Sequence, residues 1–330
     1  MKEVLNKLIK YQTLSRDEAF EILSNLATGK YNNSQMAAFM TVYLMRSIRV
    51  EELEGFRDAM LELCIRVPSE KYDAIDLCGT GGDGKNTFNI STVSSFVVAG
   101  AGQKVVKHGN YGVSSISGSS NVLEQLGVQF SNDLATIETS IAEAGICFLH
   151  APLFHPAMKN VGPVRRDLGI KTFFNMLGPM VNPAFPKSQV VGVFSLELAR
   201  LYGYLYQNTD KRFAIVHSLD GYDEISLTGS FKLITNHEEK VISPEELGFE
   251  TLTEASLAGG EDVPASAKIL LDILNDQSTI AQKSAVLANA GLAIATGKNL
   301  TIEEGIAQAK ASIESGKAFK AFELFKSINK

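Results

Sequence analysis

The sequence has no apolar run long enough to cross a membrane, no tryptophan, three scattered cysteines and no excess of basic charge. Its richest apolar run, residues 36–45, falls well short of the roughly 20 residues of a membrane span, so we expect a buried helix there. The N-terminus lacks the apolar stretch and cleavage site of a signal peptide. No C-x-x-C pair is present, which indicates unreactive thiols in a reducing compartment. We therefore expect a cytoplasmic protein that has no membrane partner.

The formal net charge of −6 argues against a nucleic-acid partner, because such proteins present a basic face to phosphate. The 330 residues suggest two domains, and the hydrophobic fraction of 45% supplies enough apolar surface for a sizeable core. No repeat or low-complexity segment is visible. The composition therefore predicts a folded protein that binds small molecules.

The first part of the chain has the pattern of helices. Ser15 and Glu18 form the S-x-x-E signature of a capping box, and apolar residues follow at helical spacing. Pro68 ends this block, and no strand pattern precedes Tyr72. We predict a small all-helical N-terminal domain over residues 1–70.

After residue 71 the pattern alternates between strands, loops and helices, which is typical of a parallel sheet. Strands are expected over 72–78 and 104–110, each followed by a loop and a helix, and over 189–195 and 212–218. A β-rich stretch follows over 231–236 and 240–247, and the chain is helical again from about 265. We predict a larger α/β domain over residues 71–330, with a central, mostly parallel sheet flanked by helices.

The loop after the first strand has the sequence Gly79-Thr80-Gly81-Gly82-Asp83-Gly84 and then Lys85. As a G-x-G-x-x-G dinucleotide fingerprint it lacks the acidic residue expected at the end of the next strand, where Lys107 and His108 stand. As a P-loop it lacks the hydroxyl after the lysine, since Asn86 follows, and the next helix is expected only from Ser91 or Thr92. A plain turn at Asp83-Gly84 is the third interpretation.

Two successive strand–loop–helix units favour another interpretation. Each offers glycine- or serine-rich backbone followed by a helix N-terminus, which attracts anions through unpaired N–H groups and partial positive charge. Two such sites side by side suit a ligand with two separate phosphate groups. The candidate polar partners are Asn89, Ser91 and Thr92 in the first unit, and Lys107, Ser114, Ser115 and Ser119 in the second.

The motifs GTGGDG, FNIST, KHGN and SGS, in this order and spacing, resemble those of the anthranilate phosphoribosyltransferases. The resemblance runs over nearly the whole chain, including residues 155–184 and the segment GYDEIS at 221–226. It implies transfer of a phosphoribosyl group from phosphoribosyl pyrophosphate to anthranilate in tryptophan biosynthesis, with magnesium and release of pyrophosphate. It also implies a homodimer through the helical domain, which helices from residues 155–178 would join.

The resemblance also implies roles for individual residues. Asp223 and Glu224, with Ser91, match the metal site. The anthranilate contacts match Gly79, His108, Asn110 and Arg165, and Arg165 would form a bidentate pair with the carboxylate. We assign no general base, because the amine attacks as a neutral nucleophile and positioning is the main requirement. The residues matched to phosphoribosyl pyrophosphate are Gly79, Gly82, Asp83, Thr87, Asn89, Ile90, Ser91, Thr92, Lys107, Ser115 and Ser119.

The chain departs from the family pattern at two positions. Tyr111 follows KHGN where relatives usually carry arginine, so no guanidinium is available there, and Lys171 replaces a more usual arginine. A related class with this fold, the pyrimidine nucleoside phosphorylases, has lysine, histidine and serine directly before the glycines, where this chain has Asp76-Leu77-Cys78. A relative without anthranilate activity would lack Asn110 and Arg165, and both are present. From sequence alone, Asp223 and Glu224 also fit an ordinary acidic turn after Gly221.

Overall fold

The computed structural model describes residues 1–112 and 116–330. These residues form two compact units. The helical unit comprises residues 1–66 and 151–183, and the α/β unit comprises residues 67–150 and 184–330. The helical unit therefore takes its residues from two separated stretches of the chain. Among the described helices, none is long and apolar enough to span a bilayer.

The helical unit begins with four helices of the N-terminal stretch. The predicted capping box is confirmed, because the Ser15 hydroxyl accepts from the Glu18 backbone N–H at 3.2 Å and Glu18 accepts from the Ser15 N–H at 2.7 Å. The elements of this unit are α1 (Lys2–Ile9), α2 (Arg16–Ala27), α3 (Asn33–Met45), α4 (Val50–Glu62), α8 (Ala151–Phe154), α9 (Met158–Leu168), α10 (Phe174–Leu177) and the 3-10 turn η2 (Gly178–Val181).

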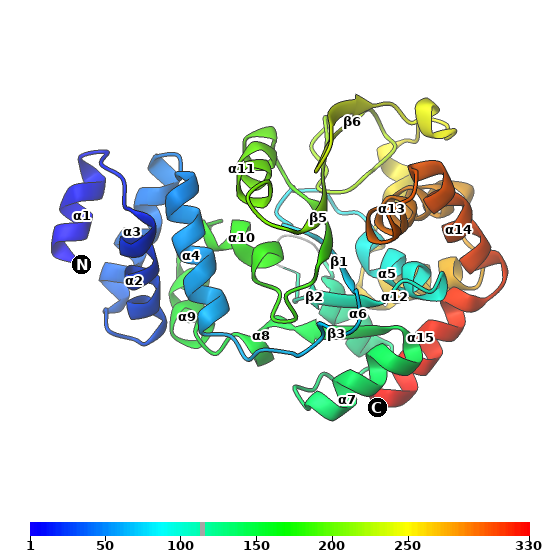
Figure 1. The fold of residues 1–330 in the computed structure, drawn as a ribbon, viewed down its shortest axis with the longest axis horizontal. Coiled ribbons are helices and arrows are strands. Elements are labelled where there is room, and N and C mark those ends of the chain that lie inside the picture. Colours follow the sequence, from blue (N-terminus) through cyan, green and yellow to red (C-terminus); the bar gives the residue numbers. More distant parts are fainter. Residues whose placement is uncertain (113–115) are drawn as a thin grey trace. The chain divides into compact units, whose positions relative to one another are not determined.

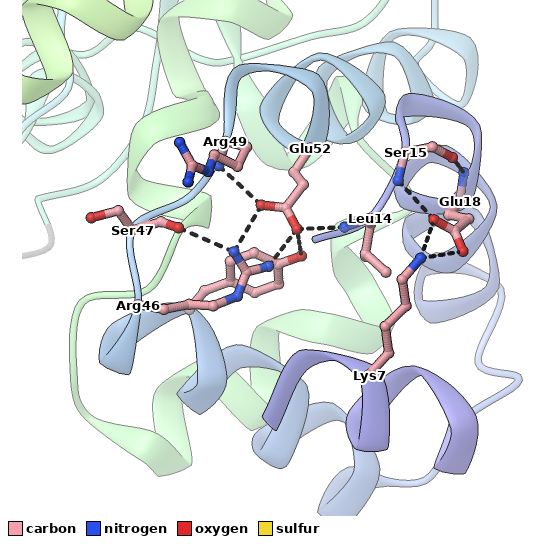
Figure 2. A network of polar contacts seen from close by, with 9 residues as sticks. Lys7, Leu14, Ser15, Glu18, Arg46, Ser47, Arg49 and Glu52 are labelled. Carbon is pink, nitrogen blue, oxygen red and sulfur yellow. Dashed lines mark hydrogen bonds and ion pairs between the residues drawn. The ribbon is translucent and has the colours of Figure 1, made fainter. Parts of the chain in front are cut away.

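A buried carboxylate ties the turn before α2 to α4 within the helical unit. Glu52 has no exposed surface; it accepts from the Leu14 N–H at 2.9 Å and from the Tyr43 hydroxyl at 3.0 Å. It also forms an ion pair with Arg46 and accepts from the Arg49 N–H at 2.9 Å (Figure 2). A buried carboxylate without partners is strongly destabilising, so these donors hold the turn and the helix in one arrangement.

The α/β unit is built on a seven-stranded sheet in the order β3-β2-β1-β4-β5-β6-β7. The strands from β3 to β5 are parallel, and β6 and β7 add an antiparallel hairpin at one side. The strands are β1 (Ile75–Gly79), β2 (Val105–Gly109), β3 (Ile146–His150), β4 (Ser188–Gly192), β5 (Arg212–Ser218), β6 (Phe231–Thr235) and β7 (Glu239–Ile242).

Helices cover both faces of this sheet (Figure 1). Ile75 and Leu77 of β1 point into a core that they share with α5 and α13, whereas α11 packs on the sheet at β5 and β6. The predicted fold class is confirmed. The helical elements of this unit are α5 (Ile90–Gly100), α6 (Ser119–Gln125), α7 (Leu134–Thr139), the π-turn η1 (Ser140–Ala144), α11 (Leu196–Tyr206), η3 (Glu245–Leu247), η4 (Glu254–Leu257), α12 (Val263–Leu274), α13 (Ile280–Lys298), α14 (Ile302–Glu314) and α15 (Lys317–Ile328).

The four strands predicted over 72–78, 104–110, 189–195 and 212–218 correspond to β1, β2, β4 and β5, and the β-rich stretch forms β6 and β7. The sequence did not predict β3. Its residues, Ile146–His150, form a short run without alternation, and periodicity does not separate such a buried strand from a piece of buried helix.

Candidate active site

The predicted site residues of the α/β unit follow the carboxyl ends of parallel strands. The chain order reverses between β1 and β4, which are neighbours in the sheet, and ligands of open α/β sheets bind in the crevice outside such a point. Three strands that meet at this edge, β1, β2 and β4, each end in a glycine: Gly79, Gly109 and Gly192. At these three strand ends, backbone atoms rather than side chains therefore line the crevice.

The glycine loop needs its glycines for two different reasons. A Cβ on Gly79 would lie 2.3 Å from Oδ2 of Asp223, so only glycine allows this carboxylate to approach. Gly81, Gly82 and Gly84 have φ angles of 66°, 78° and 77°, in the left-handed region that favours glycine. The loop is therefore built around the Asp223 side chain, and the Gly81 N–H donates to Oδ2 of that carboxylate at 2.6 Å.

The P-loop interpretation is wrong, because the helix after the loop, α5, begins only at Ile90 and not directly after Lys85. The helix start predicted at Ser91 or Thr92 also needs a correction. Asn89 is the N-cap, and its side-chain amide does not cap the helix but donates to the Ser117 carbonyl at 3.1 Å. This bond links the first predicted phosphate site to the second.

Three carboxylates gather beside the glycine loop. Asp223 is buried, and Glu224 lies close enough to Ser91 for the hydroxyl and the backbone N–H of that serine to lower the pKa of its carboxyl. Asp83 lies next to them, with one oxygen 3.5 Å from the Asp223 nitrogen. Burial raises the pKa of Asp223 well above its usual range, and the charges of Glu224 and Asp83 raise it further. The carboxylates therefore repel one another, most strongly at the buried Asp223.

One lysine partly offsets this negative charge. Lys107, only 2% exposed, donates to the Leu77 carbonyl and to the Ser91 hydroxyl, the latter at 3.3 Å. Burial raises the pKa of Glu224 to about 7, and the charge of Lys107 and the Ser91 hydrogen bonds act against that increase. A single ammonium for three carboxylates leaves the cluster short of positive charge.

This donor set suits magnesium. Mg²⁺ prefers oxygen ligands and keeps several waters, so two carboxylates and a hydroxyl are enough protein ligands. Ser91, Asp223 and Glu224 could provide them, and a divalent cation would supply the missing positive charge. No three His, Cys, Asp or Glu side chains outside residues 113–115 come close enough to hold a metal by themselves, so water or substrate oxygens would complete the shell. The residues fit the ion, and the assignment of these ligands stays a prediction.

The second predicted phosphate site lies between the end of β2 and the start of α6. The Ser119 hydroxyl donates to the Asn110 carbonyl at 3.2 Å, which closes the turn against the helix. Gly118 allows the two segments to touch, since a Cβ there would lie 2.1 Å from the Gly112 nitrogen. The structure thus brings Lys107 and Ser119 to one edge of the sheet, and Ser114 and Ser115 lie outside the described residues.

The remaining predicted site residues continue around the first loop. Thr87 forms an antiparallel bridge with Ala258, which fastens the end of the glycine loop to the segment after η4. Ile90 and Thr92 are buried in the first turn of α5. Their side chains therefore pack inside, and their backbone N–H groups donate to the Phe88 and Asn89 carbonyls at 2.7 Å and 3.1 Å.

The residues predicted to bind anthranilate lie on both units. His108 is buried near the end of β2, while the exposed Asn110 accepts from the Tyr111 N–H at 2.8 Å. Arg165 lies on α9 of the helical unit. It is half-buried, with its guanidinium 5.2 Å from the centre of the Phe174 ring, and burial lowers its pKa. The neighbouring Arg166 is exposed, so Arg165 is the arginine that the helical unit partly encloses.

Two family models match the chain. The "Glycosyl transferase family, helical bundle domain" covers residues 2–64, and the "Glycosyl transferase family, a/b domain" covers residues 71–319. Anthranilate phosphoribosyltransferase from Christiangramia forsetii is 63% identical over 100% of this chain and 99% of its own length. The Flavobacterium johnsoniae enzyme is 59% identical over the full length of both. The chain belongs to the anthranilate phosphoribosyltransferases.

Solved anthranilate phosphoribosyltransferases have the same fold. The enzyme from Thermus thermophilus superposes with a TM-score of 0.92 at 32% identity, covering 98% of each chain. The Saccharomyces cerevisiae enzyme in complex with PRPP and Mg superposes with a TM-score of 0.90 at 27% identity, covering 98% of this chain and 96% of that one. The recognition made from the motifs is therefore confirmed.

The chain has two positioning features that the motifs did not reveal. Gly192 supports the acidic pair, because a Cβ there would lie 1.5 Å from the Asp223 carbonyl oxygen. Asn289, buried on α13, accepts from the Ile225 N–H at 3.0 Å and donates to its carbonyl at 2.8 Å. The sequence contains only weak signals of these two roles, because Gly192 is simply a glycine that ends a strand and Asn289 is a polar residue inside an apolar helix.

The departure from the family pattern at Tyr111 also has a structural account. Its hydroxyl donates to Glu124 of α6 at 2.7 Å, and its ring meets His150 edge-on, with centroids 4.8 Å apart. In this chain, an aromatic contact and a hydrogen bond therefore hold Tyr111 against Glu124 and His150, and no positive charge stands at position 111.

Proposed function

We propose that this chain transfers the 5-phosphoribosyl group of phosphoribosyl pyrophosphate to the amine of anthranilate, giving N-(5-phosphoribosyl)anthranilate and pyrophosphate. The amine nitrogen forms a bond to ribose C1 as the C1–oxygen bond to pyrophosphate breaks. The bonding pair leaves with pyrophosphate, and the amine proton passes to solvent. The observation that carries the proposal is the cluster of Asp83, Asp223, Glu224 and Lys107 at the carboxyl edge of β1 and β2.

The leaving group needs stabilisation because it departs with a heavy negative charge. We assign it to the glycine loop and the start of α5, where backbone N–H groups and a helix N-terminus favour anions. The residues in this role are Gly79, Gly82, Asp83, Thr87, Asn89, Ile90, Ser91 and Thr92. Magnesium, held by Ser91, Asp223 and Glu224, would neutralise charge on the departing oxygens.

The ribose phosphate is assigned to the second site, at Lys107, Ser115 and Ser119. Support comes from the closed turn between β2 and α6 and from the buried ammonium of Lys107. Under this assignment, the two phosphate groups of one substrate bind at the ends of two neighbouring strands. The bond between Asn89 and Ser117 keeps those two sites in register with each other.

Anthranilate is assigned to Gly79, His108, Asn110 and Arg165. Arginine presents a planar fork that matches a carboxylate, and its charge persists even where burial lowers the pKa. Asn110 is exposed at the end of β2 and retains its side-chain amide protons for a ligand. The work of these residues is to orient the amine, since a well-aligned nucleophile removes much of the barrier.

A homodimer through the helical unit, as the resemblance implies, is part of the proposal. Its support is a set of large apolar side chains that α1, α3 and the residues after them leave exposed. Light scattering after size-exclusion chromatography tests the dimer. We expect the mass of a dimer for the wild type and the mass of a monomer for Met45→Lys. The exposed apolar residues are Ile9, Tyr11, Leu44 and Met45. The cytoplasmic location stays a prediction from the cysteine pattern.

The activity is tested by mixing the protein with anthranilate, phosphoribosyl pyrophosphate and Mg²⁺ and following the loss of anthranilate fluorescence. We expect a loss that stops when a chelator removes the metal. A folded protein that leaves the fluorescence unchanged would refute the proposal. Nucleosides with inorganic phosphate would then be the next substrates, because the nucleoside phosphorylases share the fold.

A further inference from the structure

A buried carboxylate, outside all the assigned site residues, lies in β1, an interior strand of the sheet. Asp76 has no exposed surface. It points to the face of the sheet opposite Ile75 and Leu77, because side chains alternate along a strand. Burying a charge in a sheet is costly unless hydrogen bonds compensate it, and an apolar side chain would avoid the cost. Such a residue needs a reason beyond packing.

The contacts of Asp76 point to the end of β2. Oδ1 accepts from the backbone N–H of His108 at 3.2 Å, and Oδ2 accepts from Nε2 of Gln189 at 3.2 Å. The thiol of Cys78 lies 3.4 Å from Oδ2. One oxygen therefore binds the backbone of the neighbouring strand, and the other binds side chains.

The bond to His108 lies where β1 and β2 are joined by side chains. The two strands pair at Ile75 and Val105. Towards their carboxyl ends, the ammonium of Lys107 donates to the Leu77 carbonyl, and the Asp76 carboxylate accepts from the His108 N–H. Two charged side chains, one from each strand, thus set the spacing of the strands just before Gly79 and Gly109. The turn that carries Asn110 starts from this point.

A relay of hydrogen bonds fixes the orientation of the Asp76 carboxylate. Gln189 is fully buried, and its Oε1 accepts from the Tyr206 hydroxyl at 2.8 Å and from Nζ of Lys211 at 3.0 Å. Its amide nitrogen is therefore directed to Asp76. Because an ammonium has no acceptor, the Gln189 amide cannot reverse without facing a donor with a donor.

We infer that Asp76 is a positioning residue for the acceptor half of the reaction: it holds the end of β2, and with it His108 and Asn110, through the His108 backbone N–H. This inference rests on the proposed function, which assigns His108 and Asn110 to anthranilate. The phosphate-binding loop after β1 is held separately, by Asp223 and by the bridge at Thr87. Loss of Asp76 should therefore affect anthranilate more than phosphoribosyl pyrophosphate.

The test moves the carboxylate from position 76 to position 189. In Asp76→Asn, one of the two carboxylate oxygens becomes an amide nitrogen, which must face either the His108 N–H or Nε2 of Gln189, donor against donor in both cases. In the double variant Asp76→Asn/Gln189→Glu, the carboxylate at position 189 accepts from the new amide, from Tyr206 and from Lys211, so every bond of the relay is restored. Asp73→Asn is the matched control, since Asp73 lies two residues before β1, is exposed and pairs with Arg212.

Steady-state kinetics are measured for both substrates, together with calorimetric binding of phosphoribosyl pyrophosphate. For Asp76→Asn we expect kcat/KM for anthranilate to fall by about 10- to 100-fold, as for loss of a hydrogen bond to a charged group, with the KM and Kd for phosphoribosyl pyrophosphate changed less than about threefold. The double variant should recover to within about threefold of the wild type. Asp73→Asn should match the wild type.

Three results would overturn the inference. The first is a folded Asp76→Asn variant with wild-type kinetics. The second is an equal loss for both substrates, which indicates general damage to the fold. The third is a double variant that does not fold or does not recover wild-type kinetics. If Asp76→Asn itself fails to fold, the kinetics of the double variant alone test the inference. A wild-type protein that consumes no anthranilate would instead refute the proposed function, so the two failures are distinguishable.

Discussion

Replacing Gly192 by alanine should disable the acidic pair without touching a charged residue. The added Cβ would lie 1.5 Å from the Asp223 carbonyl oxygen and 2.5 Å from its carbonyl carbon, against the 3.4 Å or more of an ordinary contact. Since β4 is held between β1 and β5, the segment around Asp223 must move, by about 2 Å, to restore normal contact distances.

The magnitude follows from this displacement. Forcing a methyl group into a close-packed site costs about 1–3 kcal/mol of the free energy of unfolding. A misplacement of about 1 Å at a reacting centre already costs on the order of 100-fold in rate. We expect Gly192→Ala to lower kcat at least about 100-fold and to raise the Mg²⁺ concentration required for half-maximal activity.

The assay is the anthranilate fluorescence assay over a range of Mg²⁺ concentrations, with urea unfolding in parallel. Gly203→Ala is the control: the nearest atom to its Cβ is 3.8 Å away, and the site lies inside α11. There alanine should add about 0.5–1 kcal/mol of stability and leave kcat unchanged. A Gly192→Ala protein with wild-type kcat and Mg²⁺ dependence would refute the argument that this glycine holds the acidic pair in place.

Three further predictions concern the charged groups. Asp223→Asn with Glu224→Gln should abolish turnover. It should also make the metal-free protein at least as stable at pH 8, because carboxylates whose pKa is raised on folding destabilise the fold once they ionise; a loss of stability in urea unfolding would contradict this. Arg165→Ala should raise the KM for anthranilate far more than that for phosphoribosyl pyrophosphate, and equal effects would argue against its role. Burial lowers the pKa of His155 from 6.5 to about 4, so its contribution to stability is complete above pH 6.5 and is lost as the pH falls towards 4. Between pH 7.5 and pH 5 the loss from this histidine is about 2 kcal/mol, and urea unfolding of His155→Gln should show a pH dependence smaller by that amount.

Much of the fold could be predicted because local chemistry encodes it. The capping box of Ser15 and Glu18 marked the start of α2, and apolar runs ending in glycine marked β1 and β2. The start of α5 was displaced by a residue or two because Ser91 and Thr92 are good caps, whereas the structure uses Asn89 as the cap and places Ser91 near Lys107 and Glu224. Here a contact between residues far apart in the chain outweighed a local preference, and no local pattern contains that information.

By itself, the sequence determined the class of fold, the family and the types of residue that meet at the site, because motif order and spacing survive without coordinates. Only the tertiary structure decided why particular residues are required. Gly79 and Gly192 are glycines because Asp223 lies against both, Asn289 holds the segment after Glu224, and Asp76 joins β1 to the end of β2. The physical reason is that steric exclusion and hydrogen bonding act over a few ångströms in space, between residues that the sequence places far apart.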